Sequence, residues 1–520
     1  MRFTQGLERA AQQRPDHIAT ICGERRQSFA QLLDRTARFG GALAELGLGK
    51  GARIAILSFN SDYYLEAYLG IAWAGGVSVP INFRWSVPEI VYALNDAGCT
   101  ALIVDDHHAQ HIQHLRSACP QIEHVLLAGS ADTPESIVGL ESLIAGAAPA
   151  ANANAGGDDL FGIFYTGGTT GRSKGVMLSH RNLCTSALSL MAEGLLPDDA
   201  VGMHGAPMFH LADMLQNTAL VLRGATHVML PAFTPLAALE TIARHKVTDT
   251  LIVPAMIQAM VDCPERTRYD TSSLRSILYG ASPASEALLR RTMEAFPNVQ
   301  LTQGYGMTET SALLTVLPWS EHAPADGKPT RLRSAGRATY DVQVRIVDAN
   351  DNDVPRGEVG EIVAQGANIM QGYLGMEQLT AETMRGGWLH TGDMGWMDEA
   401  GFVFIVDRAK DMIISGGENV FSAEVENAVA SHPAIAACAV IGIPDDAFGE
   451  SVHAVVVLHP DCDLSLDDLQ SHCRTAIAGY KVPRSMEVTD ALPMSGAGKV
   501  LKTVLREKWS QSADGIQDKN

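Results

Sequence analysis

The sequence of 520 residues has few cationic side chains for its size. It contains 39 Lys and Arg against 59 Asp and Glu, which gives a formal net charge of -20 at pH 7. Nucleic-acid binding depends largely on cations that displace counterions from the phosphate backbone, so this balance argues against a nucleic-acid partner. An anionic small molecule would have to be bound by a local group of donors rather than by an overall positive field.

The sequence also lacks paired cysteines and long apolar runs. Its eight cysteines include no CxxC pair and no Cys/His spacing typical of a metal site, which is typical of a reduced protein, so we expect a cytoplasmic location. The first residues, MRFTQGLERAAQQRPD, are polar and lack the apolar core of a signal peptide. No uninterrupted apolar run approaches the ~20 residues that cross a bilayer, so we expect no integral membrane segment.

Hydrophobic patterns predict an α/β fold. Amphipathic helical patterns alternate with short apolar runs over the first hundred residues, and a second series of the same kind follows the stretch at 165–180, which predicts two α/β subdomains with mainly parallel sheets. From about Ser334, short alternating segments with glycines between them predict a small antiparallel β unit. Beyond Arg408, mixed helix and strand patterns predict a second, smaller domain. We therefore expect an N-terminal domain at 1–407 and a C-terminal α+β domain at 408–520.

One segment points to a nucleotide. The stretch YTGGTTGRSKGVMLSH at 165–180 follows the strand pattern LFGIFYT and is rich in glycine and threonine. Backbone N–H groups of such a turn point into one concavity, which suits phosphate oxygens, and Lys174 adds a mobile ammonium. Arg172 and Ser173 separate Gly171 from Lys174, so the Gly-Lys-Ser/Thr ending of a P-loop ATPase is absent. The segment predicts binding of a nucleoside triphosphate; the alternative is a flexible loop without a ligand.

Four further segments follow in order: GYGMTET at 304–310, WLHTGDMG at 388–395, DRAKDMIISGGENV at 407–420 and PMSGAGKVLK at 493–502. Together with YTGGTTGRSKG they resemble the core motifs of the adenylate-forming superfamily, which includes acyl-CoA synthetases, firefly luciferase and amino-acid adenylation domains. In detail the chain is similar to bacterial acyl-CoA synthetases that act on fatty or aryl acids. The resemblance implies a large N-terminal domain followed by a small mobile C-terminal domain, with ATP, Mg²⁺ and coenzyme A bound during the reaction.

The resemblance also implies which residues bind ATP. The phosphates would lie on Thr166, Gly167, Gly168, Thr169, Thr170, Gly171 and Lys174, with Thr170 also near the metal. Gly167 stands where serine is usual and Ser173 where proline is usual, which removes one hydroxyl and loosens the turn. Adenine and the acyl group would lie along Gly280, Ala281, Ser282, Gly304, Tyr305, Gly306 and Met307.

Charged and hydroxyl residues complete the implied nucleotide site. Thr308 would contact the phosphate that becomes AMP, and Glu309 would bind Mg²⁺, a hard cation that prefers carboxylate oxygen. Asp393 would accept hydrogen bonds from the two ribose hydroxyls. Arg408 would make a second contact with ribose or phosphate.

Lys499, in SGAGK, is implied as the catalytic lysine. Adenylation brings a carboxylate against the α-phosphate of ATP, and a cation between these two anions stabilises the charge that develops. The family uses one site for two half-reactions, with the C-terminal domain turning about a hinge that falls here on Lys410. Ser415, Gly416 and Gly417 would then line the tunnel for the pantetheine arm of coenzyme A; the alternative is that the glycines only form a tight turn.

The segment PMFHLADM at 207–214 resembles the acid-binding side of the site. His210 would act in catalysis by gating the acyl pocket, or would be a structural histidine. Leu211 stands where amino-acid adenylation domains place an aspartate for the substrate ammonium, so an amino acid is disfavoured. Asp213 stands where glycine is commoner and would meet a polar substituent or cap a helix. Apolar segments at 252–260 and 278–282 suit a fatty or aryl tail.

We therefore predict an ATP-dependent, AMP-forming acyl-CoA ligase for a medium- or long-chain fatty acid or an aryl acid. Three alternatives remain: a freestanding enzyme that loads an acyl carrier protein, a luciferase-like oxidase, and a non-catalytic acyl-binding protein on the same fold. The last should have lost Thr308, Glu309, Asp393 and Lys499, all of which are present. The expected partners are the carboxylic acid, ATP and coenzyme A, and a homodimer is left open.

Overall fold

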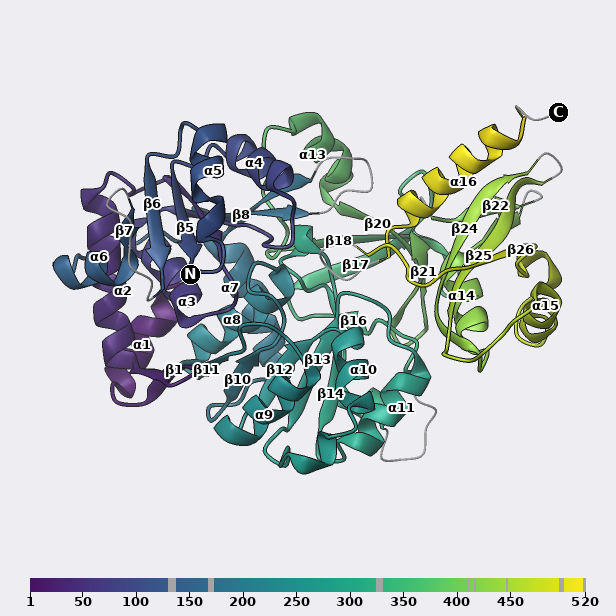
Figure 1. The fold of residues 1–520 in the computed structure, drawn as a ribbon, viewed down its shortest axis with the longest axis horizontal. Coiled ribbons are helices and arrows are strands. Elements are labelled where there is room, and N and C mark those ends of the chain that lie inside the picture. Colours follow the sequence, from purple (N-terminus) through teal and green to yellow (C-terminus); the bar gives the residue numbers. More distant parts are fainter. Residues whose placement is uncertain are drawn as a thin grey trace. The chain divides into compact units, whose positions relative to one another are not determined.

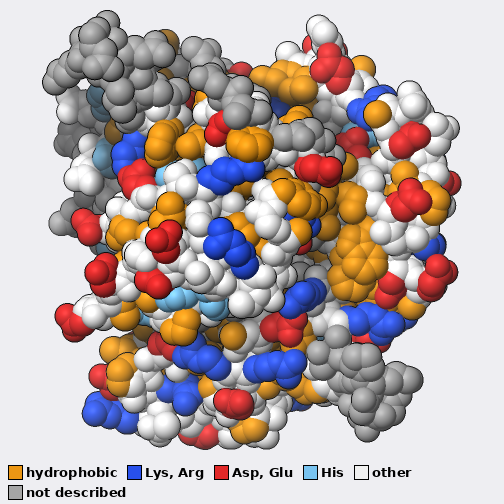
Figure 2. Space-filling model, turned by 90° about the vertical axis from the view of Figure 1, so that its right-hand side faces the viewer, with side chains coloured by type: hydrophobic (Ala, Val, Ile, Leu, Met, Phe, Trp, Pro, Cys, Tyr) orange, Lys and Arg blue, Asp and Glu red, His pale blue; other side chains and the backbone are white. Residues whose placement is uncertain are grey.

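The computed structural model describes residues 1–129, 137–166, 173–323, 331–408, 411–415, 418–445, 448–494 and 500–517, without the side chains of residues 408, 419 and 510–517. The described chain forms two compact units, one from residues 1–344 and 364–389 and one from residues 345–363 and 390–517. Among the helices described, none is long and apolar enough to cross a membrane. The acidic and basic side chains coloured in Figure 2 are interspersed on the face that it shows.

One large sheet of the first unit combines strands from residues 201–338 with two strands from the start of the chain. Over the described residues it has nine strands in the order β16-β15-β14-β13-β12-β10-β11-β1-β2. The six strands from β14 to β1 in this order run parallel, so their carboxyl ends meet at one edge of the sheet. Its strands are β1 (Ile18–Cys22), β2 (Arg25–Ser28), β10 (Val201–His204), β11 (Thr226–Met229), β12 (Asp249–Ile252), β13 (Ser276–Gly280), β14 (Gln300–Tyr305), β15 (Thr315–Leu317) and β16 (Arg337–Ala338).

The other large sheet of this unit has eight strands within the described ranges, in the order β19-β9-β8-β4-β3-β5-β6-β7. Its strands β8 and β9 are antiparallel, and Thr166 lies opposite Lys174. The predicted phosphate loop therefore connects two paired strands. The strands are β3 (Arg53–Leu57), β4 (Val77–Pro80), β5 (Ala101–Asp105), β6 (His124–Ala128), β7 (Val138–Gly139), β8 (Leu160–Thr166), β9 (Lys174–Ser179) and β19 (Gly372–Tyr373).

Helices cover both sheets. In Figure 1, α9, α10 and α11 lie along β10 to β14. Helix α8 packs on α7 and on β10, β11 and β12, and its Met214 shares one buried cluster with Ile54 of β3 and Phe164 of β8, so the largest core joins the two sheets. The α-helices of this unit are α1 (Gln5–Gln13), α2 (Phe29–Glu45), α3 (Asp62–Ala74), α4 (Val87–Asp96), α5 (Ile112–Ala118), α6 (Leu140–Gly146), α7 (His180–Ala192), α8 (Leu211–Arg223), α9 (Pro235–His245), α10 (Pro254–Asp262), α11 (Glu286–Ala295), α12 (Trp319–His322) and α13 (Glu377–Thr383), and the 3₁₀ helices are η1 (Ala109–His111), η2 (Arg266–Arg268), η3 (Thr308–Thr310) and η4 (Arg385–Gly387).

Two smaller sheets complete the fold. One has the order β17-β18-β20-β21 in the described chain, with β17 (Val342–Val347), β18 (Gly360–Gly366), β20 (Leu389–Met397) and β21 (Val403–Arg408). The other belongs to the second unit and contains β22 (Ile413–Ser415), β23 (Glu418–Val420), β24 (Ile435–Asp445), β25 (Gly449–Leu458) and β26 (Ser485–Val488), with α14 (Ser422–Ala430), α15 (Leu466–Cys473), α16 (Lys502–Gln517) and η5 (Gly479–Lys481). Val425, Val452 and Leu469 lie in its core.

All eight cysteines are free, and their exposure differs sharply. Cys462 is exposed, Cys22 and Cys438 are half-buried, and the others are buried. Burial raises the pKa of the Cys22 thiol to about 11 and that of Cys438 to about 12. At neutral pH these two thiols are therefore protonated and weakly nucleophilic.

Candidate active site

The carboxyl edge of the nine-stranded sheet gathers most of the predicted residues of the first unit. Strands β13 and β14 pair so that Gly280 lies opposite Gly304. The segments that leave these two strands carry Ala281 and Ser282 on one side and Gly306 to Glu309 on the other. In open α/β sheets ligands bind at the carboxyl ends of the strands. The parallel register therefore places the predicted adenine and metal segments side by side.

The backbone at this edge is unusually close and partly strained. A Cβ atom on Gly280 would lie 2.1 Å from the Gly304 carbonyl oxygen, and one on Gly306 would lie 2.3 Å from the Ala312 carbonyl oxygen, so both positions require glycine. Ala281 has a φ of 64°, in the left-handed region that residues with a side chain rarely adopt. Such strain is concentrated at functional sites because it holds a segment in one shape.

Glu309 forms the centre of a buried polar contact. The Tyr373 hydroxyl donates to Glu309 Oε1 at 2.7 Å, and the Met370 N–H donates to the Glu309 carbonyl at 2.8 Å. Lys174 Nζ lies 4.9 Å from the centroid of the Tyr373 ring, a cation–π contact. Burial and then the Glu309 carboxylate raise the pKa of Tyr373 far above 10, so its hydroxyl remains a donor.

Tyr373 is a site residue that sequence reasoning missed. It lies in β19, which pairs with β9 so that Tyr373 is opposite Val176, two residues after Lys174. The tyrosine thus connects the predicted metal carboxylate with the predicted phosphate lysine, although 64 residues separate it from Glu309. The local sequence GYLG is that of an ordinary turn, so only the pairing of β19 with β9 could have indicated the contact.

The donor set around Glu309 fits Mg²⁺ delivered with a nucleotide. Of the residues described, Tyr373 alone is hydrogen-bonded to the carboxylate, through Oε1, which leaves Oε2 for another ligand. No group of three or more His, Cys, Asp or Glu side chains in the described ranges could hold a metal by themselves. Mg²⁺ in such sites is usually bound by one or two carboxylates together with substrate phosphates and water.

The acid-side segment joins β10 to α8. Phe209 is buried and packs edge-on against Phe83, with 5.2 Å between the ring centroids. His210 is half-buried and is the N-cap residue of α8, and Leu211 after it is buried. Asp213 neither caps the helix nor lies at a surface: its side chain is 0% exposed and Oδ2 lies 2.9 Å from His204 Nδ1. The helix-cap prediction for Asp213 is wrong, because His210 is the N-cap residue and His204 reaches Asp213 from the preceding strand. A contact of Asp213 with a polar substituent of the acid stays a prediction.

In the sheet of β17, β18, β20 and β21, the two residues predicted to contact the ribose are cross-strand partners. Asp393 in β20 lies opposite Arg408 in β21. The Asp393 N–H donates to Thr391 Oγ1 at 3.1 Å, and the Thr391 hydroxyl donates to the Ile362 carbonyl at 2.7 Å, which fixes the strand next to the carboxylate. The backbone therefore presents these two residues together.

Several predicted residues lie outside the described ranges, namely Gly167, Gly168, Thr169, Thr170, Gly171, Lys410, Gly416, Gly417 and Lys499. The residues that flank Lys499 are well held. Met494 pairs with Val500 across an antiparallel bridge, and the Leu501 N–H donates to the Pro493 carbonyl at 2.8 Å. Lys502 Nζ then lies 2.8 Å from Glu426 Oε1 of α14.

The residues that flank Lys410 and Gly416 are also bound within the second unit. Asp407 accepts a hydrogen bond from the Ser422 N–H, and Asp411 accepts one from Arg506 at 2.9 Å. Ser415 is buried, and its hydroxyl accepts a hydrogen bond from Arg484 at 3.0 Å. Described contacts therefore anchor both sides of Lys410 and of Lys499, and the residue that precedes Gly416.

Comparisons with known proteins agree with this geometry. The family model "AMP-binding enzyme" matches residues 7–374, and "AMP-binding enzyme C-terminal domain" matches residues 424–499. A feruloyl-CoA synthase of Amycolatopsis sp. is 38% identical over 96% of this chain and 98% of its own length. The fatty acid–acyl-carrier-protein ligase ScoC of Streptomyces coeruleorubidus is 35% identical over 97% of this chain and 96% of its own.

The fold is shared with the solved structure of a coenzyme A synthetase. The o-succinylbenzoate coenzyme A synthetase MenE from Bacillus subtilis, solved in complex with ATP and a magnesium ion, has a TM-score of 0.83 to this chain. It is 30% identical and covers 97% of this chain and 99% of its own. These matches confirm the predicted fold class and superfamily. The chain belongs to the AMP-binding, adenylate-forming enzyme family and is an acid–thiol ligase of the acyl-CoA synthetase type.

Proposed function

We propose that the enzyme activates an apolar carboxylic acid, aryl or fatty, as an acyl-adenylate and transfers the acyl group to coenzyme A. The observation that carries this proposal is the buried contact of Glu309, Tyr373 and Lys174 at the carboxyl edge of the parallel sheet. It combines a carboxylate for Mg²⁺ with a lysine for phosphate, as adenylation requires. The acid-side segment leaves the same sheet at the same edge, from β10.

In the first half-reaction a carboxylate oxygen of the acid attacks the α-phosphorus of ATP, the bond to the β-phosphate breaks and pyrophosphate leaves. Lys174 would bind the leaving phosphates, and Glu309 would hold Mg²⁺, which neutralises phosphate charge when bound. Thr308 would donate to the α-phosphate, and Lys499 would lie between acid and phosphate. Asp393 would accept hydrogen bonds from the ribose. In the second half-reaction the coenzyme A thiolate attacks the acyl carbon and AMP leaves.

The acid-side residues favour an apolar acid. Phe83, Phe209 and Leu211 place aromatic and aliphatic carbon around the start of α8. Asp213, the carboxylate nearest to them in the sequence, is bound by His204 and is therefore not available to a substrate ammonium. An aryl acid comes first among the candidates, since feruloyl-CoA synthase is 38% identical to this chain. A fatty acid comes second.

The test is pyrophosphate release over a panel of aryl, fatty and amino acids, each with and without coenzyme A. We expect turnover with an aryl or fatty acid, a strong increase on adding coenzyme A, and no turnover with amino acids. The absence of pyrophosphate release with every acid would contradict the proposal and favour a non-catalytic acyl-binding protein.

Loading of an acyl carrier protein is a second candidate, favoured by the 35% identity to the ligase ScoC. It shares the adenylation step and differs in the thiol acceptor. Acyl transfer to a carrier protein that exceeds transfer to coenzyme A at equal concentration would replace the primary proposal by this one.

Replacing Tyr373 by phenylalanine should raise the Mg²⁺ concentration needed for half-maximal adenylation. The variant keeps the ring beneath Lys174 but removes the hydroxyl that orients Glu309. We expect about a tenfold increase in the Mg²⁺ requirement, the effect typical of residues that orient a metal ligand. The measurement is pyrophosphate release against Mg²⁺ concentration. Tyr373→Leu, which also removes the ring, should lower the affinity for ATP as well. An unchanged Mg²⁺ requirement in Tyr373→Phe would refute this role.

Replacing Gly417 by leucine should slow transfer to coenzyme A more than adenylation. A branched side chain would obstruct the narrow pantetheine arm, whereas the acid and ATP would bind elsewhere. The two steps are separated by measuring pyrophosphate exchange and thioester formation on one preparation. Equal rates of thioester formation in the variant and the wild type would show that Gly417 does not line the pantetheine tunnel.

A further inference from the structure

The segment that carries Phe209 and His210 is closed at its base by a buried ionisable pair. His204 is the last residue of β10, and Asp213 lies in the first turn of α8. Their side chains are both 0% exposed and meet at 2.9 Å, between His204 Nδ1 and Asp213 Oδ2. The acid-side segment 205–212, which ends in the first two residues of α8 and is called the 205–212 loop below, therefore has its two ends joined through side chains as well as through the backbone.

A second histidine extends the pair. His204 Nε2 lies 3.0 Å from His227 Nδ1, and the two rings are stacked with 5.2 Å between their centroids. Thus both ring nitrogens of His204 are engaged, which holds the ring at a fixed angle. Burial lowers the pKa of His227 well below its usual value, so His227 accepts or donates as a neutral ring.

The interior of the loop is bound by Asn60, which lies between β3 and α3, and by Tyr68 of α3. The Asn60 side chain donates to the carbonyls of His204 and Ala206 at 3.1 and 2.8 Å and accepts from the Met208 N–H at 2.8 Å. The Tyr68 hydroxyl donates to the Met208 carbonyl at 2.9 Å. All these groups are buried. The backbone up to Met208 therefore has little freedom, and Phe209 and His210 follow directly.

We infer that Asp213 is a positioning residue for recognition of the acid: together with His204 it holds the 205–212 loop so that Phe209 and His210 keep one placement. The inference rests on the proposed function, because it assumes that this loop faces the acid. A residue without an acceptor at position 213 would leave the His204 side chain without this partner, at the cost of a buried unsatisfied donor.

The test separates acid recognition from general stability. Asp213→Leu keeps the branching of the side chain at Cγ but removes the acceptor, and Asp213→Asn keeps one acceptor oxygen for His204. We expect Asp213→Leu to raise KM for the acid about tenfold while KM for ATP stays unchanged, since small displacements of positioning groups have effects of this size or larger. Asp213→Asn should recover most of the loss. Asn60→Leu, which releases the same loop from its other side, should raise the KM for the acid in the same way and covers the case in which Asp213→Leu does not fold.

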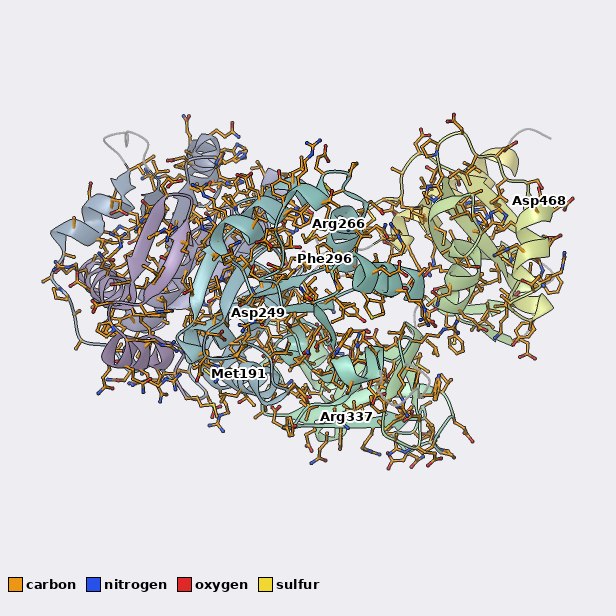
Figure 3. All side chains as sticks on the ribbon, turned by 90° about the horizontal axis from the view of Figure 1, so that it is seen from below. Met191, Asp249, Arg266, Phe296, Arg337 and Asp468 are labelled. Carbon is orange, nitrogen blue, oxygen red and sulfur yellow. The ribbon has the colours of Figure 1, made fainter. Side chains whose placement is uncertain are left out.

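The matched control is Asp249 of β12, which is labelled in Figure 3. It is 3% exposed and lies in the same sheet, but its carboxylate accepts from Thr248 at 2.6 Å rather than closing the acid-side loop. Asp249→Leu should leave KM for the acid unchanged in the enzyme that remains folded. Equal changes in KM for acid and ATP, or the same acid-specific change in Asp249→Leu, would overturn the inference.

A measurement without turnover distinguishes failure of this inference from failure of the proposed function. Hydrogen exchange of the amides in 205–212 should be faster in Asp213→Leu than in the wild type and in Asp249→Leu. Unchanged exchange would show that Asp213 does not hold the 205–212 loop, whatever the activity of the variant. Wild-type enzyme that is inactive on every acid would refute the proposed function, while the exchange rates would still decide whether Asp213 holds the loop.

Discussion

Replacing Lys499 by alanine should slow acyl-adenylate formation by about a thousandfold, the upper range for removing one preorganised donor to a developing charge. Adenylation forces two anions together, and the ammonium is the group that would offset their repulsion. Transfer of the acyl group from supplied acyl-adenylate to coenzyme A should remain close to the wild-type rate, because no phosphate anion is attacked in that step. Single-turnover assays of the two half-reactions measure the two rates separately.

The anchors on either side of this lysine make the experiment interpretable. The bridge between Met494 and Val500 and the contact of Lys502 with Glu426 do not involve the Lys499 side chain, so the variant should fold normally. Lys508→Ala is the matched control, since Lys508 is an exposed lysine of α16 whose partner is Glu487. It should keep both half-reactions. A loss of both steps to the same extent in Lys499→Ala would show that the lysine has no specific role in adenylation.

Replacing Glu309 by glutamine should lower the rate of adenylation by about a hundredfold at ordinary Mg²⁺ concentrations, an effect comparable to losing one transition-state contact. Glutamine keeps an oxygen that accepts from Tyr373 but has no negative charge for a divalent cation. Raising the Mg²⁺ concentration should therefore recover part of the activity. Pyrophosphate exchange against Mg²⁺ concentration is the measurement.

The control for Glu309→Gln replaces a different carboxylate of the first unit. Glu286→Gln neutralises a carboxylate in the first turn of α11 that is paired with Arg333, and it should leave the Mg²⁺ dependence unchanged. A Glu309→Gln enzyme with the same Mg²⁺ dependence as the wild type would place the metal on another residue. Comparison with Tyr373→Phe then separates the charge of the carboxylate from its orientation.

Local patterns predicted the elements of the fold well. The run LFGIFYT is β8 (Leu160–Thr166), and the small antiparallel unit expected from about Ser334 contains the antiparallel pair β20 and β21. The ends of an element were harder to predict where strand pairing, rather than the hydrophobic pattern, extends it. Strand β24 runs on through Pro444 to Asp445 because β25 lies opposite it, and the apolar pattern ends before that proline.

The sequence predicted residues of the site only where they belong to a recognisable motif. Gly280 and Gly304 were expected to lie together, and the parallel register of β13 and β14 places them opposite each other. The contact of Tyr373 with Glu309 and that of Asp213 with His204 were not foreseen. The first depends on the pairing of β19 with β9, and the second on how the end of β10 meets the first turn of α8; residue-by-residue patterns encode neither. The partners of buried polar groups are therefore the part of a site that needs a structure.

The distribution of free thiols gives the natural chain a selective attachment point. Cys462 is exposed in the second unit, whereas burial raises the pKa of several other thiols, Cys22 and Cys438 among them. A maleimide dye at neutral pH should therefore attach first at Cys462, without any engineered cysteine. Energy transfer from that dye to a fluorescent nucleotide would then report the position of the smaller unit during each half-reaction.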